Sequence, residues 1–347
     1  RDPFAWHRIR TPVRRAHSRP PTRTKGNRIV NHALLAAVLA LSAQQEAQDD
    51  AAPQPSVLFV QAKGVVHVLL GGEPFTTYHY ADGAKPYFYP VLGPGGASMT
   101  RGWPMVEGGT GEDHDHPHQR SLWYAHGDVN GHDFWAEGEG HGRIEHRAID
   151  TVKAGATGLL RVKNDWVAAD GTLICTELRT MQFRATDAGR EIDFTIELTP
   201  ASGDLRLGDT KEGSMAIRLA PTLRLDGPVA AGHCKNSAGH TDGECWGKRA
   251  AWVDYWGPIG DRTLGVAMFD HPKNRNHPTW WHARNYGLFA ANPFGAHDFE
   301  GQPRGAGDQV VPAGETITFR YRLLFHEGEV DARVLDERLS EFGEESP

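Results

Sequence analysis

The chain has little cysteine and no long apolar segment. Three of its 347 residues are cysteines, and no run approaches the roughly 18–20 apolar residues that a membrane-spanning helix needs. The sequence also lacks a Walker loop, an HExxH helix, a CxxC pair and a GxGxxG motif after a predicted strand. These absences argue against a nucleotide-cofactor fold, against the common zinc motifs and against a protein that spans a membrane.

Positive charge is scarce outside the first 28 residues. The whole chain has 37 Lys and Arg against 44 Asp and Glu, a formal net charge of −7. Residues 1–28 hold nine of the cations and one acid, a net charge of +8, which leaves −15 for residues 29–347. A net negative charge on residues 29–347 disfavours binding to nucleic acid or to an anionic membrane surface. We therefore expect neither partner.

An apolar stretch near the N-terminus has the length of a secretory signal. Residues 33–41 read ALLAAVLAL and precede the small residues Ser42 and Ala43, a pattern typical of a signal peptide and its cleavage site. We predict a signal peptide at residues 30–43, a polar linker at 44–55, and export to the periplasm or the extracellular space. Residues 1–29 are predicted to be a basic disordered tail. It is either a long leader segment or, because the sequence does not begin with Met, translation upstream of a start near Val30.

Residues 56–347 are predicted to form one domain built from strands. Between residues 141 and 200, short β-branched runs alternate with the turn sequences AGATG, AADG and TDAG. Turns at intervals of about 8–12 residues are typical of a large antiparallel β-sandwich or barrel. Only residues 331–345 show a helical period of apolar residues. We therefore predict an all-β fold, a large antiparallel β-sandwich with a short C-terminal helix.

The three cysteines fall into two groups. Cys175 lies in the apolar strand sequence TLICTEL and is predicted to be a core thiol. Cys234 and Cys245 bracket a Gly-rich loop and would suit a disulfide in an exported protein. Spacing alone does not fix such a pairing, because a disulfide needs a specific geometry.

Histidine is concentrated in two parts of the chain. Seven of the 19 histidines lie in residues 111–147, where an even spread would give about two, and a second group lies in residues 271–299. A third segment of interest, GDTKEGSMAIRL at 208–219, has Lys211 and Glu212 in a turn that enters a strand. The segments 111–135, 208–213 and 277–298 are expected to converge on one cleft, which the function proposed from them requires.

The sequence His116-Pro117-His118 predicts a pair of imidazoles on one side of the chain. Proline favours an extended conformation for itself and for the residue before it, so the two rings would point the same way. Such a pair can bind a metal or transfer protons near neutral pH. Arg120 lies two residues further on, so its side chain would point the same way and would clamp an oxyanion or a carboxylate. The alternative is a structural loop whose histidines bond backbone carbonyls.

These patterns assign roles to individual residues. Glu212 is a candidate general acid or base if its surroundings raise its pKa, whereas Lys211 suits a salt bridge, and tryptophans near the histidines stack on sugars or pack in the core. The catalytic candidates are His116, His118, Arg120 and Glu212. The candidates for substrate binding are His126, Asp128, Trp135, Lys211, His282, Arg284 and Asn292. No organic cofactor is expected, and a divalent metal would have His116 and His118 as its candidate ligands.

Residues 115–135, DHPHQRSLWYAHGDVNGHDFW, closely resemble the bacterial PmoA-like family, which carries the label "methane oxygenase PmoA". The similarity continues through residues 208–219, 248–259, 277–295 and 319–328, and it covers about residues 57–343. Gln119 and Ser121 stand where family members often have His and Gly. A methane monooxygenase membrane subunit would need several membrane spans, which this sequence lacks. We therefore do not expect that activity.

The order of motifs is also remotely similar to that of the galactose-mutarotase supersandwich proteins. This resemblance implies a sugar bound in a concave sheet, where histidines and a carboxylate exchange protons at the ring oxygen and the anomeric hydroxyl. The sequence thus indicates an exported protein that acts on a small carbohydrate or glycoside by acid/base chemistry at a sugar carbon: epimerisation, elimination or hydrolysis. The alternatives are a non-catalytic carbohydrate-binding module, a metal-dependent glycoside hydrolase or lyase, and a structural envelope protein.

Overall fold

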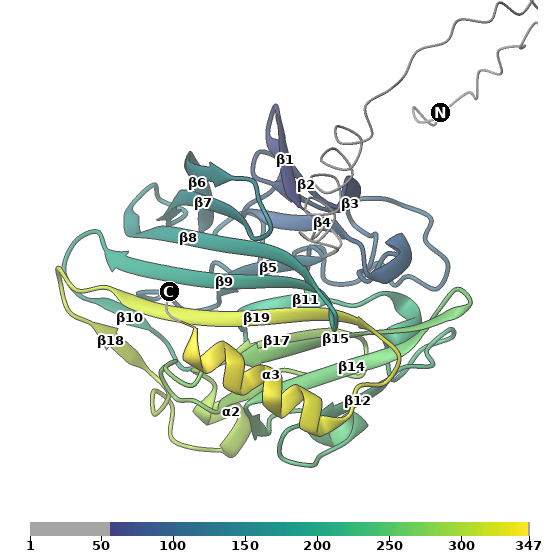
Figure 1. Cartoon of the computed structure of the whole chain (residues 1–347). Coiled ribbons are helices and arrows are strands. Elements are labelled where there is room, and N and C mark those ends of the chain that lie inside the picture. Colours follow the sequence, from purple (N-terminus) through teal and green to yellow (C-terminus); the bar gives the residue numbers. More distant parts are fainter. Residues whose placement is uncertain (1–55, 346–347) are drawn as a thin grey trace, which may run out of the picture. The chain divides into compact units, whose positions relative to one another are not determined.

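The structure is a computed structural model that describes residues 56–345. The tail, signal peptide and linker predicted for residues 1–55 lie outside the described residues, so export stays a prediction. The described residues form two large antiparallel sheets, one small two-stranded sheet and a C-terminal helix (Figure 1). The predicted all-β fold, a large antiparallel sandwich with a short C-terminal helix, is confirmed.

The first sheet has nine strands in the order β1-β2-β3-β4-β5-β11-β17-β16-β13, and each pair of neighbours is antiparallel. Its strands are β1 (Val57–Ala62), β2 (Val65–Leu70), β3 (Glu73–His79), β4 (Tyr87–Val91), β5 (Leu122–His126), β11 (Gly213–Arg218), β17 (Leu288–Asn292), β16 (Thr279–Trp281) and β13 (Arg249–Ala250). Neighbours such as β5 and β11 are far apart in sequence, so this sheet brings the predicted site segments side by side.

The second sheet has eight strands in the order β12-β14-β15-β19-β9-β8-β7-β6. Its strands are β12 (His233–Asn236), β14 (Trp252–Ile259), β15 (Arg262–Asp270), β19 (Ile317–Glu327), β9 (Gly189–Pro200), β8 (Leu173–Thr186), β7 (Gly158–Val167) and β6 (Arg143–Lys153). The small sheet pairs β10 (Leu205–Leu207) with β18 (Gln309–Val311). The short helical segments are η1 (Pro94–Gly96), η2 (Pro221–Leu223), η3 (Asp242–Cys245) and α2 (Ala296–Glu300).

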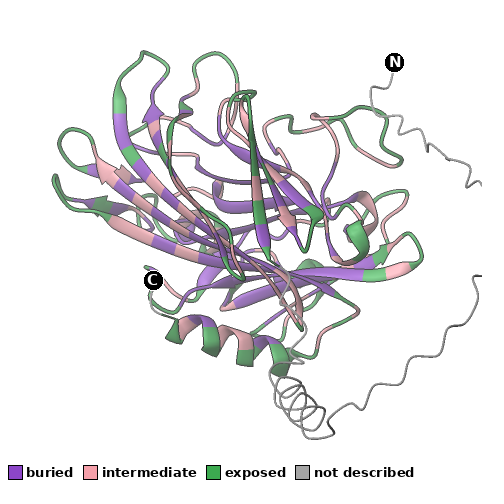
Figure 2. Ribbon diagram, turned by 45° about the horizontal axis from the view of Figure 1, so that its top comes forward, coloured by how far each residue is buried: buried purple, intermediate pink, exposed green. Residues whose placement is uncertain are grey.

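Aromatic side chains join the two large sheets into one core. Phe75 of β3 lies 6.3 Å from Phe183 of β8, and Tyr124 of β5 lies 6.1 Å from Trp166 of β7, measured between ring centroids. Buried residues follow the strands of both sheets, as the purple ribbon of Figure 2 shows. Strands β5 and β11 are buried along their whole length, so both of their faces are covered. The loops that cover the face away from the second sheet carry the candidate site.

The C-terminal helix α3 (Ala332–Glu344) packs on the outer face of the second sheet (Figure 1). Its buried Leu335 and Phe342 contact Trp252 of β14 and Phe269 of β15. The carboxylate of Asp331 accepts a hydrogen bond from the backbone N–H of Arg333 at 2.8 Å and caps the helix. The helix predicted from the apolar period at 331–345 is therefore confirmed.

The cysteines are buried free thiols. Cys175 is fully buried in β8, as expected for a core thiol, and Cys234 in β12 and Cys245 in η3 are also buried. No disulfide joins the latter two cysteines in this structure. Among residues 56–345, no helix combines the length and the hydropathy needed to cross a membrane.

Candidate active site

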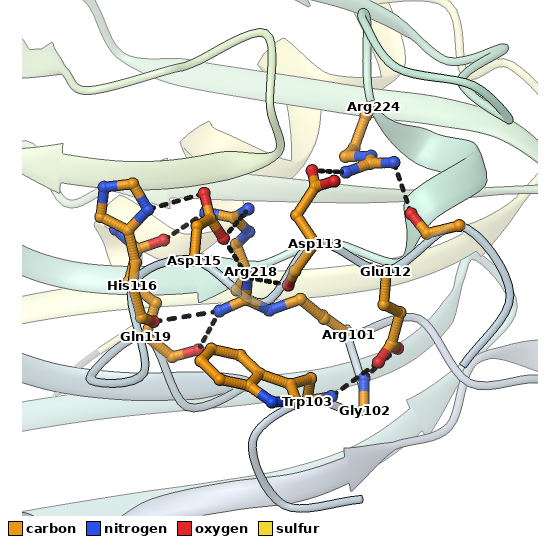
Figure 3. Close-up of polar contacts among 11 residues, drawn as sticks. Arg101, Gly102, Trp103, Glu112, Asp113, Asp115, His116, Gln119, Arg218 and Arg224 are labelled. Atoms are coloured by element: carbon orange, nitrogen blue, oxygen red, sulfur yellow. Dashed lines mark hydrogen bonds and ion pairs between the residues drawn. The ribbon is translucent and has the colours of Figure 1, made fainter. Parts of the chain in front are cut away.

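Two buried arginines hold the loop that precedes β5 (Figure 3). Arg101 donates to Asp115 Oδ1 at 2.5 Å, and Arg218, at the end of β11, donates to the same oxygen at 3.0 Å. Arg218 also donates to the side-chain oxygen of Gln119. Both arginines are at most 1% exposed, and buried charges of this kind need paired, hydrogen-bonded partners. The shared carboxylate of Asp115 therefore ties the loop to the sheet.

Arginine side chains also satisfy the backbone of this loop, which contains no strand or helix. Arg101 donates to the carbonyl oxygens of Asp113 at 3.2 Å and His116 at 3.1 Å. Arg224, which follows η2, donates to the carboxylate of Asp113 and to the carbonyl of Gly111 at 2.7 Å (Figure 3). These hydrogen bonds satisfy carbonyl groups that backbone N–H groups would satisfy in a helix or a strand. Residues 111–119 are consequently held in one conformation.

His116 and His118 meet in this loop. Their ring centroids lie 5.7 Å apart, with an angle of 79° between the ring planes. The extended conformation predicted for this segment is wrong: His116 has a φ of 45°, and its carbonyl accepts a hydrogen bond from Gln119 N at 3.0 Å. Arg101 binds the same carbonyl and so stabilises the turn. The two imidazoles therefore come together through a turn, and not through strand alternation.

A carboxylate and an aromatic ring orient His116. Its Nδ1 lies 2.7 Å from Asp115 Oδ2, and because a carboxylate only accepts, Nδ1 carries a proton. The ring stacks on Tyr286 with 5.4 Å between centroids. Burial alone would raise the pKa of Asp115, but Arg218, His116 and Arg101 bring it below its usual range. An imidazole oriented by a carboxylate in this way is suited to proton transfer through its Nε2 atom.

His118 is held neutral by its surroundings. Burial, followed by the positive charges of Lys85 and His116, lowers the pKa of His118 to about 4, while Glu137 and Glu212 oppose this shift. Its ring nitrogens make no hydrogen bond within residues 56–345 in this structure. At neutral pH the side chain is therefore an uncharged imidazole that can accept a proton.

Lys85 and Glu137 form a buried ion pair, and both of its charges affect the pKa of His118. Lys85 Nζ donates to Glu137 Oε1 and to the carbonyl of Trp135, both at 2.9 Å. Arg120 Nε donates to the two carboxylate oxygens of the same Glu137 at 3.2 and 3.1 Å. Burial lowers the pKa of Lys85. Burial alone would raise the pKa of Glu137, but the two cations lower it. Arg120, predicted to clamp substrate, is thus already held by a carboxylate of the protein, and its catalytic role stays a prediction.

The predicted carboxylate, Glu212, lies just before β11. Its Oε1 pairs with Lys211 Nζ at 2.8 Å, and the side chain is 34% exposed. This contact raises the pKa of Lys211, which matches the salt bridge expected for that residue. Glu212 therefore combines access to solvent with a fixed cationic neighbour.

Side chains from the third segment fix the backbone that carries Glu212. His282 Nδ1 lies 2.8 Å from the carbonyl oxygen of Lys211, and Asn292 Nδ2 donates to the carbonyl of Thr210 at 2.8 Å. Asp298 accepts from Lys211 N at 2.8 Å. His282 and Asn292 are both buried. The structure thus gives these two predicted substrate contacts a positioning role beside Glu212.

The three predicted segments meet around Tyr286. Its ring stacks on His116 and lies under Arg218, whose guanidinium carbon is 4.6 Å from the ring centroid. The guanidinium of Arg284 lies 5.4 Å from the same ring. Burial raises the pKa of Tyr286, and the charge of Glu212 adds to that shift. His282, from the same segment as Tyr286, contacts the carbonyl of Lys211 beside Glu212, so loops from distant parts of the sequence form one cluster.

Three predicted substrate contacts lie outside this cluster. His126 is 1% exposed and its Nε2 lies 2.8 Å from the carbonyl of Gly208. Asp128 forms two hydrogen bonds with Arg206, at 2.7 and 2.8 Å. Trp135 is buried against another tryptophan, with 5.2 Å between ring centroids. Each therefore has a structural role, and direct contact with substrate stays a prediction for them.

The buried His126 gives the stability of the protein a pH dependence. Burial lowers its pKa from 6.5 to about 4, so between these values the unfolded chain binds a proton that the folded protein does not. Stability is therefore lost as pH falls from 6.5 towards 4, by up to about 1.4 kcal/mol per pH unit for this group. Urea unfolding of the wild type and of His126→Gln at several pH values measures the difference in slope. Equal slopes would contradict the assignment.

The metal hypothesis has two candidate ligands. Among residues 56–345, no three His, Cys, Asp or Glu side chains are grouped in a way that would hold a metal ion. His116 and His118 face each other edge to face, and the Nδ1 of His116 is engaged by Asp115. Structural metal sites usually have four protein ligands and catalytic zinc sites three. The described residues thus offer His116 Nε2 and His118 as imidazole donors, and the metal hypothesis stays a prediction.

Sequence reasoning missed several residues of the cluster, namely Lys85, Glu137, Arg218 and Tyr286. A signal existed for Arg218, which is a charged residue in the apolar sequence SMAIR, and for Lys85, which precedes the apolar sequence PYFYPV. Long side chains of this type are rarely buried unless they are paired. No comparable signal marked Glu137 or Tyr286, because their importance depends on contacts with distant loops.

The described residues form an antiparallel β-sandwich, and a candidate site of histidine, arginine and carboxylate side chains lies in loops beside its first sheet. The chain belongs to the family of unknown function DUF6807, whose model matches residues 65–340. No curated protein sequence matches the chain. The resemblance to PmoA-like proteins stays a prediction.

Solved structures similar to this chain include proteins that are named for sugar chemistry. A galactose mutarotase-like protein from Lactobacillus casei ATCC 334 has 9% identity and a TM-score of 0.33, with 78% of this chain and 100% of that chain covered. A glycoside hydrolase family 97 enzyme from Pseudoalteromonas sp. strain K8 has 9% identity and a TM-score of 0.33, covering 80% and 36%. A galactose mutarotase related enzyme from Lactobacillus acidophilus has 9% identity and a TM-score of 0.27, covering 79% and 100%. At such low similarity, function has to be argued from this chain's own site.

Proposed function

We propose that the protein binds a small carbohydrate or glycoside at this cluster and catalyses acid/base chemistry at a sugar carbon. One observation carries the proposal: a neutral imidazole, His118, lies beside a second, carboxylate-oriented imidazole and within the field of Glu212. A proton acceptor beside a second imidazole whose tautomer is fixed is the kind of pair that epimerisation, elimination and glycoside hydrolysis require.

The roles follow from the contacts of each group. His118 accepts a proton from the substrate, since its pKa of about 4 keeps it uncharged at neutral pH. His116 moves a second proton through Nε2 while Asp115 holds its Nδ1–H. Glu212 stabilises positive charge that develops on the substrate, and Lys211 fixes its position. Arg101 and Arg218 keep Asp115 in place, so they are positioning residues.

A substrate screen with three readouts tests this function. The full chain is incubated with oxidised, acidic and plain glycosides in D2O, and NMR records exchange of ring protons, formation of an unsaturated product and release of a reducing end. Turnover by any of these routes supports the proposal and identifies the reaction. Binding without turnover would instead make the protein a carbohydrate-binding module. Activity that a chelator abolishes and a divalent metal restores would establish the metal-dependent alternative.

Export is part of the proposal and has a separate test. A signal peptide at residues 30–43 implies that a signal peptidase cleaves after Ala43. Mass spectrometry of the protein recovered from a secretion-competent bacterial host should then show an N-terminus at Gln44. Recovery of the uncleaved chain from the cytoplasm would overturn the localisation and leave the chemistry unaffected.

A further inference from the structure

A cavity of about 310 Å³ adjoins the catalytic cluster. It is lined by Gly243, Trp246, Ala283, Arg284, Asn285 and Tyr286. Tyr286 belongs to both sites, because its ring also stacks on His116. The volume is at the lower end of what small-molecule pockets have, roughly 300–1,000 Å³, and it suits a single sugar residue. Two of the walls are aromatic rings, whose faces pack well against sugar C–H groups.

Arg284 is the one charged residue that lines this cavity. Its guanidinium carbon lies 5.7 Å from the ring centroid of Trp246 and 5.4 Å from that of Tyr286. Within residues 56–345 it forms no ion pair and no side-chain hydrogen bond. Stacking on two rings holds the planar guanidinium in place and leaves its N–H donors available.

Two carboxylates of the neighbouring cluster each pair with two cations. Asp115 pairs with Arg101 and Arg218, and Glu137 pairs with Lys85 and Arg120. Arg284 has no such partner among the described residues. A guanidinium that is held in place and unpaired attracts an anion.

We propose that this cavity binds the acidic group of the substrate, and that the substrate is therefore a sugar bearing a carboxylate or a phosphate. The inference rests on the carbohydrate function proposed above and narrows its substrate class. The N–H fork of Arg284 matches the geometry of either anion. Trp246 and Tyr286 contact the sugar ring, and Tyr286 directs it towards His116.

Matched ligands test the inference. Calorimetry or NMR titration compares methyl glucuronoside with methyl glucoside, methyl galacturonoside with methyl galactoside, and glucose 6-phosphate with glucose. The acidic member of at least one pair should bind about 10-fold tighter or more, because hydrogen bonds to charged groups contribute more than neutral ones. The preference should weaken as salt is added. The uronoside and phosphate arms show which anion the cavity takes.

Variants assign the preference to Arg284. Arg284→Gln should lose about 10-fold or more in affinity for the acidic sugar and little for its neutral partner, and Arg284→Lys should lose less than the Gln variant. Arg249→Gln is the matched control, because Arg249 also lies over a tryptophan, Trp280, at 4.7 Å but does not line the cavity. It should bind both sugars as the wild type does.

The possible outcomes separate this inference from the carbohydrate function on which it rests. Equal binding of neutral and acidic sugars would overturn this inference and leave the carbohydrate function standing. A preference that persists in both Arg284 variants would overturn the assignment to this cavity. Absence of binding to any sugar, with the fold confirmed by circular dichroism, would overturn the carbohydrate function and this inference with it.

Discussion

Replacing Glu137 with alanine is expected to lower the free energy of unfolding by about 3–5 kcal/mol. The change removes the carboxylate that accepts a hydrogen bond from Lys85, which is 2% exposed. A buried ammonium without a carboxylate partner loses its compensation for desolvation. Urea denaturation at neutral pH measures the effect.

The pH dependence of this variant gives a second signature. Without Glu137, the pKa of Lys85 falls further below that of the unfolded chain, since Glu137 is the main group that raises it in the folded protein. The unfolded chain then binds more protons than the folded protein, so stability rises with pH. Glu139→Ala is the matched control, because Glu139 is an exposed acid two residues away. Equal stability of the two variants would show that the Lys85–Glu137 pair does not anchor the site.

The architecture was predictable because it depends on local patterns. Alternating burial along β9 follows from apolar residues at every second position between Ile192 and Leu198, and the turn that joins β8 to β9 contains Gly and Asp at the expected places. The helix α3 was equally clear from its apolar period. The partners of each strand were not predictable, because pairs such as β5 with β11 and β11 with β17 join segments about 70–90 residues apart.

The sequence predicted which segments form the candidate site, but it did not predict which of their side chains meet there. Composition identified the three loops that meet, but strand alternation in β5 places His126 in the core, while His118 lies in the turn that precedes β5. The turn at His116 depends on Arg101, which lies 15 residues earlier in the same connection between η1 and β5. Lys85 and Arg218 act through carboxylates that are 52 and 103 residues away. Such contacts exist only once the sheets have formed.

The structure joins these parts into one physical account. A loop without regular structure carries the two imidazoles, so its backbone and carboxylates are held by three arginines, namely Arg101, Arg218 and Arg224. A catalytic group contributes only if its geometry is fixed before substrate binds. Other groups act on the chemistry: burial first, and then Lys85 and His116, lower the pKa of His118. The arginines therefore fix the geometry of the loop, while burial and two different cationic groups keep one imidazole neutral.

Replacing His118 with alanine is expected to reduce kcat/KM about 10²–10⁴-fold on a substrate found by the screen. His118 is the uncharged imidazole of the cluster, and no other contact within residues 56–345 depends on its ring nitrogens. The melting temperature should therefore change little, and the loss should appear in kcat. The acidic limb of the wild-type pH profile should lie near pH 4, where His118 takes up a proton and ceases to be a base, and this limb should be absent from the residual activity of the variant.

His114→Ala is the matched control, because His114 lies in the same loop but stacks on Trp103 at 5.2 Å and is exposed. Its kcat/KM should stay close to that of the wild type. If a folded His118→Ala protein retained full activity, the proton acceptor would have to be His116, whose Nδ1–H is fixed by Asp115. Asp115→Asn would then test the orientation, since an amide has both a donor and an acceptor and no longer dictates which ring nitrogen of His116 carries the proton. Its free energy of unfolding is measured alongside, because Asp115 also pairs with the buried Arg101 and Arg218. The two variants thus show which imidazole accepts the proton: His118, whose pKa is lowered, or His116, which Asp115 orients.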